Sequence, residues 1–388
     1  MRGSRIKVVH LSSAHGADDS RIFWKECLSL AQAGYDVCFV VPGDRPCRRE
    51  NVEIVTVRRR SGRLARMLLS TAAVVGAGLR CRGDVYHFHD PELIPWGLAL
   101  RLLGKRVVYD AHEDVPRDLL FKRWVPLVLR WPLSRLIAGV EWIADRTLSG
   151  IVAATPTIAR RFPASGAALV QNYARLAEFP ALDASKRPHG RTVAYVGGVT
   201  PERGAVEMVD AMARVERYPD ARLVVAGEIW PDWLVGKLAG SAGWRRVDYR
   251  GRQDRAGVHA ILAQADVGLA LFHPVQSYVE SQPIKLFEYM AAGLPVIAAD
   301  FPGFRKIVEA NGCGLCVPPL DTAAIAAAIE WVFEHPGLAQ EMGRRGRELV
   351  QRTYNWEREA ESLLRLYDRV LADAPARRLV TGGDTGVR

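Results

Sequence analysis

Short apolar runs alternate with segments of helical periodicity through most of the chain. The runs are rich in Val and Ile and do not alternate with polar residues, which is typical of parallel strands buried on both faces of a sheet. Strand–helix–strand order of this kind predicts a doubly wound α/β fold. In the first half, strands are expected at Ile6–Leu11, Val37–Val41, Ile54–Val57, Val85–Phe88, Val107–Asp110, Ile151–Ala154 and Leu169–Gln171, and helices at 20–33, 63–80, 92–104 and 116–148.

The pattern restarts after residues 174–190, a mixed segment with Pro and Gly that is interpreted as a linker. Because 388 residues exceed what one core usually supports, two domains are expected. The second series predicts strands at Val193–Val196, Leu223–Ala226, Val247–Tyr249, Val267–Leu271, Val296–Ala298 and Leu315–Val317, and helices at about 204–216, 255–264, 283–292, 303–310 and 322–334.

The economical architecture is two Rossmann-like doubly wound domains that face each other across a cleft, with ligands outside the carboxyl ends of the strands. The N-terminal domain is predicted at 1–175 and the C-terminal domain at 190–355. A last helix at 356–373 is expected to cross back onto the N-terminal domain, and the polar tail at 374–388 is predicted to be disordered.

Composition limits the classes of protein to which this chain can belong. Hydrophobic residues make up 49% and charged residues 25%, as in an ordinary soluble globular protein, and the few cysteines of this large chain fit a reducing cytoplasm. The net charge of +10 attracts phosphates, but it is spread along the chain without a nucleic-acid-binding signature. Cys313 and Cys316 form the only close cysteine pair, and buried core cysteines are favoured over a redox pair. No signal peptide is visible, and Leu64–Leu79 is too short to span a membrane, so it is interpreted as a buried helix.

The segment Lys122–Arg146 alternates Trp and Leu with Arg. One interpretation is an amphipathic helix pair packed on the sheet, with Pro126 and Pro132 as breakers. The other is a helix in a membrane interface, with its aromatic side down and its cations toward the head groups. Packing is the preferred interpretation, and the two are compatible if part of the face stays exposed.

The most informative segment is 277–300, which reads SYVESQPIKLFEYMAAGLPVIAAD. It places Glu280, Lys285 and Glu288 around the start of a predicted helix, and a helix N-terminus readily binds phosphate. Capping by Ser277-x-x-Glu280 and a solvated Glu288 are the structural alternative. A lysine in the first turn is electrostatically disfavoured, however, and an anionic ligand would remove that conflict. The carboxylates are then suited to hydroxyls of a sugar or ribose.

A second candidate lies in YVGGVTPERG at 195–204, between a predicted strand and helix. Its paired glycines, including Gly198, let backbone amides approach a ligand, and Arg203 offers a guanidinium fork to diphosphate oxygens. Alone, this segment would be an ordinary strand-to-helix turn. Beside Lys285, the binding interpretation is the better one.

In the first domain, polar residues follow two predicted strands, where sites lie in such folds. His112 is the better candidate and His89 the weaker, and either could be a structural histidine; Asp90-Pro91 also fits a helix start. The loop after the first strand, SSAHGADD, lacks the dinucleotide motif, and no phosphate-binding P-loop, nucleophile elbow or Asp-x-Asp occurs. No cofactor and no metal are therefore expected.

These segments together resemble the GT-B glycosyltransferases of family 4, which are retaining and use nucleotide sugars. The resemblance covers nearly the whole chain and is carried by DDSRIFWKECLSLAQAGYDV, HFHDPELIPWGLALRLLGKRVVYDAHED, YVGGVTPERG and ESQPIKLFEYMAAGLPVIAAD.

The resemblance implies a role for each candidate. Glu280 would contact the hydroxyls of the donor sugar and Glu288 the ribose, His112 would lie near the donor sugar, and Arg203 would bind the diphosphate. Gly16 falls in the acceptor-side loop, where the family has two glycines and this chain has His15-Gly16. The family's arginine before the basic-Gly pair is replaced by Gly198, and Lys285 would take over its charge.

The function expected is a retaining hexosyl transfer from a nucleoside diphosphate sugar, with His112 and Glu280 catalytic, Gly198, Arg203, Lys285 and Glu288 binding the donor, and Gly16 and His89 on the acceptor side. The expected acceptor is a lipid-linked or surface-polysaccharide intermediate at the inner membrane face, and the basic charge allows peripheral contact with an anionic membrane. A nucleotide-sugar epimerase and a non-catalytic subunit of a polysaccharide assembly complex are the alternatives.

Overall fold

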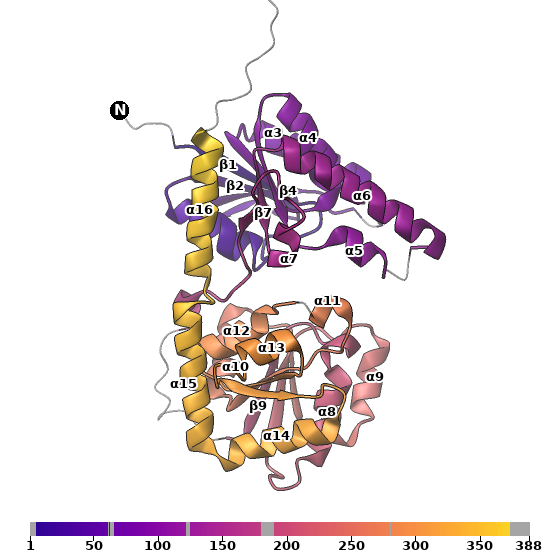
Figure 1. The fold of residues 1–388 in the computed structure, drawn as a ribbon, viewed down its shortest axis with the longest axis vertical. Coiled ribbons are helices and arrows are strands. Elements are labelled where there is room, and N and C mark those ends of the chain that lie inside the picture. The colour runs from indigo at the N-terminus through magenta and orange to yellow at the C-terminus, as the bar shows by residue number, and fades with distance from the viewer. Residues whose placement is uncertain are drawn as a thin grey trace, which may run out of the picture. The chain divides into compact units, whose positions relative to one another are not determined.

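The computed structural model describes residues 5–60, 62, 66–121, 125–179, 190–279 and 281–372. The chain divides into two compact units, each with its own sheet (Figure 1). Unit 1 comprises Met1–Gln171 and Glu359–Arg388, and unit 2 comprises Asn172–Arg358. Both are parallel α/β structures, as the apolar runs predicted.

Unit 1 contains an eight-stranded sheet in the order β3-β4-β2-β1-β5-β6-β7-β8. All neighbouring strands are parallel except β3 and β4. The seven predicted strands are confirmed within about two residues, and the edge strand β3 was missed. The strands are β1 Lys7–Leu11, β2 Asp36–Pro42, β3 Cys47–Arg49, β4 Val52–Val57, β5 Val85–Phe88, β6 Arg106–Ala111, β7 Gly150–Ala153 and β8 Ala168–Leu169.

The helices of unit 1 are η1 Ile22–Cys27, α1 Leu28–Gln32, η2 Arg66–Ser70, α3 Thr71–Arg80, η3 Pro91–Leu93, α4 Ile94–Leu102, α5 Val115–Leu119, α6 Leu127–Thr147 and α7 Pro156–Ala159. The last helix, α16 Trp356–Ala372, brings its C-terminal part onto this unit. Tyr367 of α16 lies 2.9 Å from His87, and Leu366 and Val370 pack against Gly150. The predicted return of the C-terminal helix to the N-terminal unit is thereby confirmed.

Two expectations about unit 1 are corrected. The segment Leu64–Leu79 is not a buried helix throughout, because Met67, Leu68 and Leu69 are exposed by 46%, 68% and 54%. Residues 64 and 65 lie outside the described part of the chain. Pro132 is not a breaker: it lies inside α6, where the ring is accommodated one and a half turns after the helix begins. Pro126 does separate α6 from α5, as predicted.

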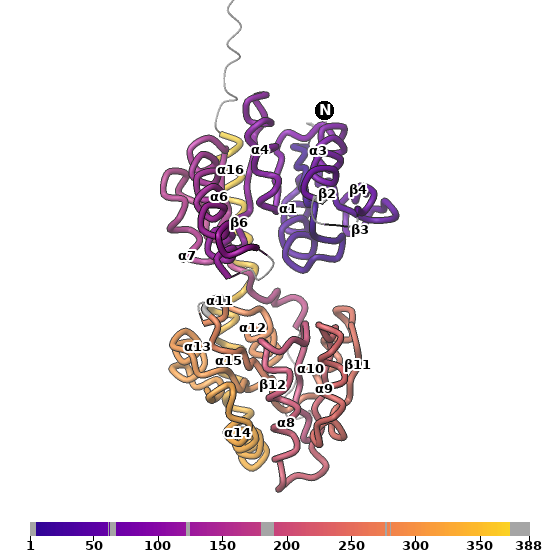
Figure 2. The backbone as a smooth tube through the Cα atoms, turned by 90° about the vertical axis from the view of Figure 1, so that its right-hand side faces the viewer, coloured from indigo at the N-terminus to yellow at the C-terminus, as the bar shows by residue number. Residues whose placement is uncertain are grey.

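Unit 2 contains a six-stranded parallel sheet in the order β11-β10-β9-β12-β13-β14. All six strands were predicted, and helices surround the sheet (Figure 2). The strands are β9 Thr192–Val196, β10 Arg222–Ala226, β11 Val247–Gly251, β12 Val267–Ala270, β13 Val296–Ala299 and β14 Gly314–Val317. The helices are η4 Leu176–Glu178, η6 Pro201–Arg203, α8 Ala205–Arg214, α9 Trp233–Ala239, η7 Ala242–Arg246, α10 Arg255–Gln264, α11 Gln276–Val279, α12 Ile284–Ala291, α13 Pro302–Ile307, α14 Thr322–Glu334 and α15 Pro336–Arg352.

Helix α12 is held against the sheet of unit 2 by a close contact at Gly268 of β12. A Cβ atom at Gly268 would lie 2.4 Å from the ring of Tyr289, so the absent side chain makes room for this ring. The Tyr289 hydroxyl accepts a hydrogen bond from the amide of Val196 at the end of β9, at 3.0 Å. This contact fixes α12, which carries Lys285 and Glu288, beside the carboxyl end of β9.

Other expectations lie partly or wholly outside the described residues. Most of the predicted linker, at 180–189, and the tail after Ala372 are among these. Cys313 is buried, as predicted for a core cysteine, and Cys316 is half-buried. Among the described residues, no helix combines the length and the apolar character that crossing a membrane requires.

Candidate active site

The turn after β9 in unit 2 exposes backbone without side chains. Gly197 has φ of +113°, a conformation that residues with a side chain rarely adopt. The hydroxyl of Tyr195 donates a hydrogen bond to the carbonyl of Gly198 at 2.8 Å, and this bond holds the turn in place. A Cβ atom at Gly198 would lie 3.0 Å from Nη1 of Arg203, so this guanidinium covers the turn. The structure thus brings two predicted donor-site residues, Gly198 and Arg203, into contact.

Lys285 approaches the same turn from the first turn of α12. Its Nζ lies 3.6 Å from the centre of the Tyr195 ring and 3.5 Å from the Cβ position at Gly197. The side chain is buried, yet Nζ has no hydrogen-bond partner in the described structure. Burial lowers the pKa of Lys285 well below its usual value, and the charge of Arg203 lowers it further against the opposing charge of Glu288. A buried ammonium group without an acceptor, beside a second cation, is suited to an anion.

Glu288 lies one turn further along α12, and its carboxylate is held by an arginine that the sequence did not single out. Nη1 of Arg255 donates to Oε1 of Glu288 at 2.7 Å, and Nη2 of the same guanidinium pairs with Glu178. Arg255 begins α10, directly after the loop that follows β11. Arg255 follows the carboxyl end of a predicted strand, and this position could have marked it as a candidate in the sequence.

Unit 1 holds the histidine candidate at the end of β6. Nδ1 of His112 lies 3.3 Å from Oδ2 of Asp110, and the side chain is 16% exposed. Burial lowers the pKa of His112, but the hydrogen bond and the charge of Asp110 outweigh it, and the net effect is a raised pKa. The ring packs edge-on against His15, with the ring centres 5.2 Å apart. The catalytic role of His112 stays a prediction.

The loop after β1 is organised by Asp90. The predicted N-cap bond of Asp90 does not form; instead, its Oδ2 accepts hydrogen bonds from Ser12 Oγ at 2.8 Å and from the Ser13 amide at 2.6 Å. His15 in this loop lies 3.0 Å from Asp19. Burial lowers the pKa of His15, but the hydrogen bond with Asp19 and the charge of Asp90 raise it to about 9.

The remaining candidates have different settings. Gly16 follows His15, and a Cβ atom there would meet nothing within 4 Å. His89 is fully buried, with Nδ1 3.0 Å from Asp110 and Nε2 2.9 Å from His10. Glu280 lies outside the described residues. The acceptor-side roles of Gly16 and His89, and the catalytic role of Glu280, stay predictions.

Two parallel α/β units, each with its own sheet, are the architecture of the GT-B glycosyltransferases, and comparison with known proteins supports this class. Residues 21–168 match the family model Glycosyltransferase Family 4, and residues 183–349 match the model Glycosyl transferases group 1. The chain belongs to glycosyltransferase family 4, and it is an enzyme of the hexosyltransferase type.

Curated relatives agree with this assignment. The phosphatidyl-myo-inositol mannosyltransferase of Mycobacterium tuberculosis is 29% identical over 294 residues, which cover 74% of either chain. The glycogen synthase of the same organism is 26% identical over 316 residues, covering 76% of this chain and 73% of the relative. Such relatives act on different acceptors, so the acceptor does not follow from family membership.

Solved structures show the same fold at lower identity. The sucrose-phosphate synthase of Thermosynechococcus elongatus superposes with a TM-score of 0.73 at 21% identity, over 95% of this chain and all of the other. The Anabaena protein Alr3699/HepE in complex with UDP-glucose gives a TM-score of 0.69 at 13% identity, over 94% of this chain and all of the other. These likenesses confirm the GT-B architecture.

Proposed function

We propose that this enzyme is a retaining glycosyltransferase that moves a hexose from a nucleoside diphosphate sugar to a hydroxyl group of a lipid-linked or surface-polysaccharide intermediate. In this proposal, the C-terminal domain binds the donor and the N-terminal domain binds the acceptor. The observation that carries it is the buried, unpaired Nζ of Lys285 beside Arg203 at a side-chain-free turn. Family membership favours transfer over the epimerase and the non-catalytic alternatives.

The donor diphosphate supplies the anion that Lys285 and Arg203 lack. The N-terminus of α12, whose first residue is Ile284, adds the positive end of a helix dipole. As the bond between the anomeric carbon and the diphosphate oxygen breaks, negative charge accumulates on that oxygen. Two cations already in place stabilise this charge without reorganisation, and groups of this kind are worth about 10²–10³ in turnover when one is removed.

The proposed transfer also accounts for the proton of the acceptor. The acceptor hydroxyl attacks on the face from which the diphosphate leaves, so the configuration at the anomeric carbon is retained. The hydroxyl proton passes to the departing phosphate oxygen, and a new bond joins the anomeric carbon to the acceptor oxygen. Glu288, held by Arg255, is proposed to bind the ribose hydroxyls. No base from the protein is required in this scheme.

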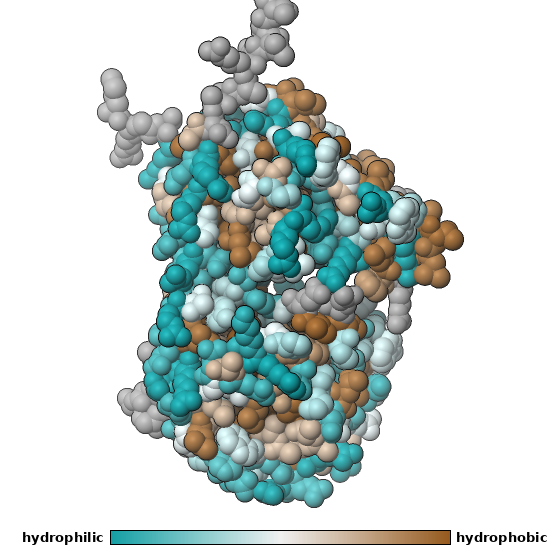
Figure 3. Space-filling view, viewed as in Figure 1, coloured by the Kyte–Doolittle hydropathy of each residue, from teal (hydrophilic) through white to brown (hydrophobic). Residues whose placement is uncertain are grey.

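The surface of α6 supports an acceptor at a membrane. Its exposed face carries Val128, Trp131 and Trp142, exposed by 83%, 68% and 57%, and apolar residues gather at its N-terminal end in Figure 3. The guanidinium of Arg146 lies 3.9 Å from the centre of the Trp142 ring. Aromatic and basic side chains on one exposed helix face are suited to the head-group region of an anionic bilayer. Part of this Trp-, Leu- and Arg-rich helix face is therefore not packed against the rest of the unit, so the membrane interpretation is compatible with the fold.

A donor panel tests the transfer reaction. Thermal shifts with UDP-, GDP-, ADP- and dTDP-sugars, measured with EDTA present, are expected to single out one nucleotide. Lys285→Ala and Arg203→Ala should then lower turnover or donor hydrolysis about 10²–10³-fold with little loss of stability. Arg214→Ala, at the exposed end of α8, is the matched control and should leave turnover unchanged. Normal kinetics in both site variants would refute the assigned role.

Vesicle sedimentation tests the membrane contact separately. The wild-type protein is expected to pellet with phosphatidylglycerol vesicles and to remain in solution with phosphatidylcholine vesicles. Trp131→Glu and Trp142→Glu should each weaken this binding at least about tenfold, because a charge is inserted into the apolar face. Trp233→Glu changes an equally exposed tryptophan of unit 2 and should have no effect. A wild-type protein that does not pellet with anionic vesicles would contradict the proposed peripheral contact with a membrane.

A further inference from the structure

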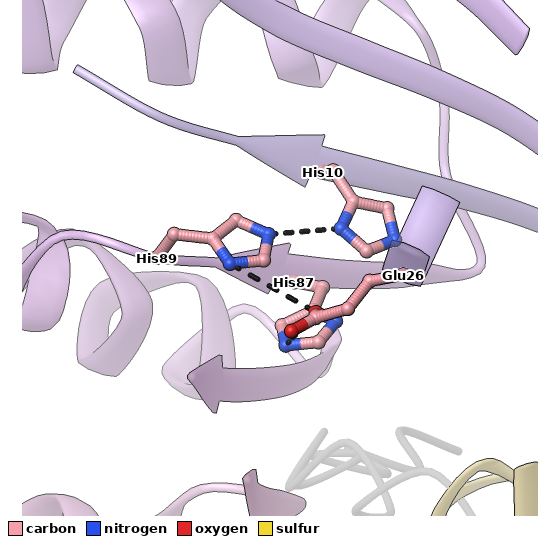
Figure 4. A group of neighbouring side chains, drawn as sticks. All are labelled: His10, Glu26, His87 and His89. Atoms are coloured by element: carbon pink, nitrogen blue, oxygen red, sulfur yellow. Dashed lines mark hydrogen bonds and ion pairs between the residues drawn. The ribbon is translucent and has the colours of Figure 1, made fainter. Parts of the chain in front are cut away.

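A cluster of four buried side chains lies on one face of the sheet in unit 1 and includes His89, the weaker of the two histidine candidates (Figure 4). His10 of β1 and His87 of β5 are register partners on neighbouring parallel strands. His89 follows two residues later and shares their face, and Glu26 reaches them from η1. One nitrogen or oxygen atom from each residue lies within 4.8 Å of the others, and all four side chains are fully buried.

Several side-chain nitrogen and oxygen atoms in this cluster have no hydrogen-bond partner among the described residues. Nε2 of His10, Nε2 of His87 and Oε2 of Glu26 have no hydrogen-bond partner in the described structure, whereas Oε1 of Glu26 pairs with Arg21. Buried polar atoms are almost always paired, because each unpaired one costs about 1–3 kcal/mol. Three such atoms, in a cluster whose possible ligand atoms lie within 4.8 Å of one another, indicate a common partner that accepts their lone pairs.

The opposite side of each residue is already held. Nδ1 of His87 lies 2.9 Å from the hydroxyl of Tyr367, and Nδ1 of His10 lies 2.9 Å from His89. The π-turn of η1 brings residues five apart onto one side, so Oε1 of Glu26 lies 3.1 Å from Nε of Arg21. Bonds that orient the far side of a ligand are typical of metal-binding histidines and carboxylates.

A proton is the alternative occupant, and it explains less. Burial raises the pKa of Glu26 well above its usual value, and the charge of Asp110 and a side-chain hydrogen bond with it raise the pKa further against the opposing charge of Arg21, so the carboxyl group would be protonated without an ion. A proton on Glu26 leaves the unpaired Nε2 atoms of His10 and His87 without a partner. Oε2 of Glu26 lies 3.8 Å from Nε2 of His87 and 3.9 Å from Nδ1 of His89. These distances are too long for a hydrogen bond, but they suit two ligands that are each about 2.0–2.2 Å from one ion.

We propose that His10, Glu26, His87 and His89 form a buried structural site for a divalent transition ion of the zinc type. Three imidazoles and one carboxylate are ligands that zinc accepts in a closed four-coordinate site. His10, His87 and Glu26 present unpaired atoms, and Nδ1 of His89 exchanges its bond with Asp110 for the ion while Nε2 keeps its bond with His10. The ion balances the excess of buried carboxylate charge from Glu26 and Asp110 over Arg21. It also ties η1 to β1 and β5 at the core of the N-terminal unit.

Metal analysis of the whole chain tests this site. The tag-free wild-type protein is refolded with one equivalent of zinc or with EDTA, desalted, and analysed by plasma mass spectrometry without any nucleotide present. The proposal expects about one zinc per chain and a higher melting temperature in the zinc sample. A protein that regains its native circular dichroism with less than about a tenth of a zinc per chain, and with the same melting temperature in EDTA, would overturn it.

Variants and a spectroscopic probe assign the ligands. Glu26→Gln and His87→Gln keep the side-chain volume and are expected to reduce zinc content at least tenfold. His259→Gln, in unit 2, removes another histidine with an unpaired nitrogen and should retain the full zinc content. If the ligand variants fail to fold, wild-type protein refolded with cobalt decides the matter. Visible absorption bands of four-coordinate cobalt support the site, and a cobalt-treated folded protein without such bands overturns it.

Discussion

Donor binding should take up a proton at Lys285. In the free enzyme, burial and the charge of Arg203 hold the pKa of Lys285 well below 10.5. A bound diphosphate places negative charge beside Nζ and favours the ammonium form. The pKa of Lys285 is therefore higher in the complex than in the free enzyme, and between the two values the complex holds more protons.

The magnitude follows from the geometry of the pocket. Nζ has no hydrogen-bond partner and lies 3.5 Å from the Cβ position at Gly197, where the diphosphate is expected. One unit of negative charge about 4 Å away, at an effective dielectric constant of about 20, is worth about 4 kcal/mol. An attraction of this size favours the ammonium form, so the pKa of Lys285 should be higher in the complex than in the free enzyme. Between these two pKa values, donor affinity should fall about tenfold for each unit of rising pH.

Calorimetry in buffers of different ionisation enthalpy measures this uptake directly. An intact nucleotide sugar is the suitable ligand, because its diphosphate diester does not titrate near neutral pH. At pH values between the free-state and the bound-state pKa of Lys285, the wild-type enzyme should take up a substantial fraction of a proton per site. Lys285→Arg keeps the cation but cannot release its proton, so this variant should bind without uptake.

Two results would refute this reasoning. One is a wild-type enzyme whose heat of binding does not depend on the buffer and whose affinity is constant from pH 7 to 9. The other is an equal uptake in the wild type and in Lys285→Arg, which would place the titrating group elsewhere. An Arg203→Ala variant refines the interpretation, because removing the neighbouring cation should raise the free-state pKa of Lys285 and reduce the uptake.

Other consequences follow from single contacts. Arg255→Ala should raise the KM for the donor about tenfold with a smaller effect on kcat, because Glu288 loses the guanidinium that holds it at 2.7 Å; an unchanged KM in initial-rate measurements would contradict this. The pKa of His15 is raised from 6.5 to about 9. The contribution of protonated His15 to the stability of the folded state is therefore complete below pH 6.5 and is lost as the pH rises through about 9. Urea titrations should show this fall in the free energy of unfolding in the wild type and not in His15→Ala. Gly268→Ala should lower the free energy of unfolding by about 1–3 kcal/mol, because the added methyl group overpacks against the Tyr289 ring. Gly236→Ala on α9, which has open space around it, should not lower the free energy of unfolding.

The sequence predicted the strands well because buried parallel strands have a strong apolar signal. The missed elements lack that signal. The edge strand β3 is three residues long and carries two arginines. Helix α15 packs through small residues, and a Cβ atom at its Gly343 would lie 2.1 Å from the carbonyl oxygen of Gly293. Glycines on a packing face resemble helix breakers when only the sequence is considered.

The candidate site was predictable where its residues are close in sequence, and less so where the fold brings them together. Lys285 and Glu288 share one helix, so their spacing was visible from the start. The partner of Glu288, Arg255, precedes it by 33 positions and begins a different helix. His10 and His87 are neighbours only because β1 lies next to β5 in the sheet. Sheet order is set by tertiary packing, which local periodicity does not contain.

Gly198, at the position where the family resemblance predicts an arginine, has a physical consequence in this chain. Nη1 of Arg203 lies 3.0 Å from the Cβ position at Gly198, so its guanidinium fills the space that a side chain there would need. Lys285 reaches the adjacent Gly197. The turn therefore keeps two cations, but one of them is now a lysine that burial can deprotonate. Because a guanidinium does not titrate and this ammonium group does, the proposed site should still attract the diphosphate, and donor binding should become sensitive to pH.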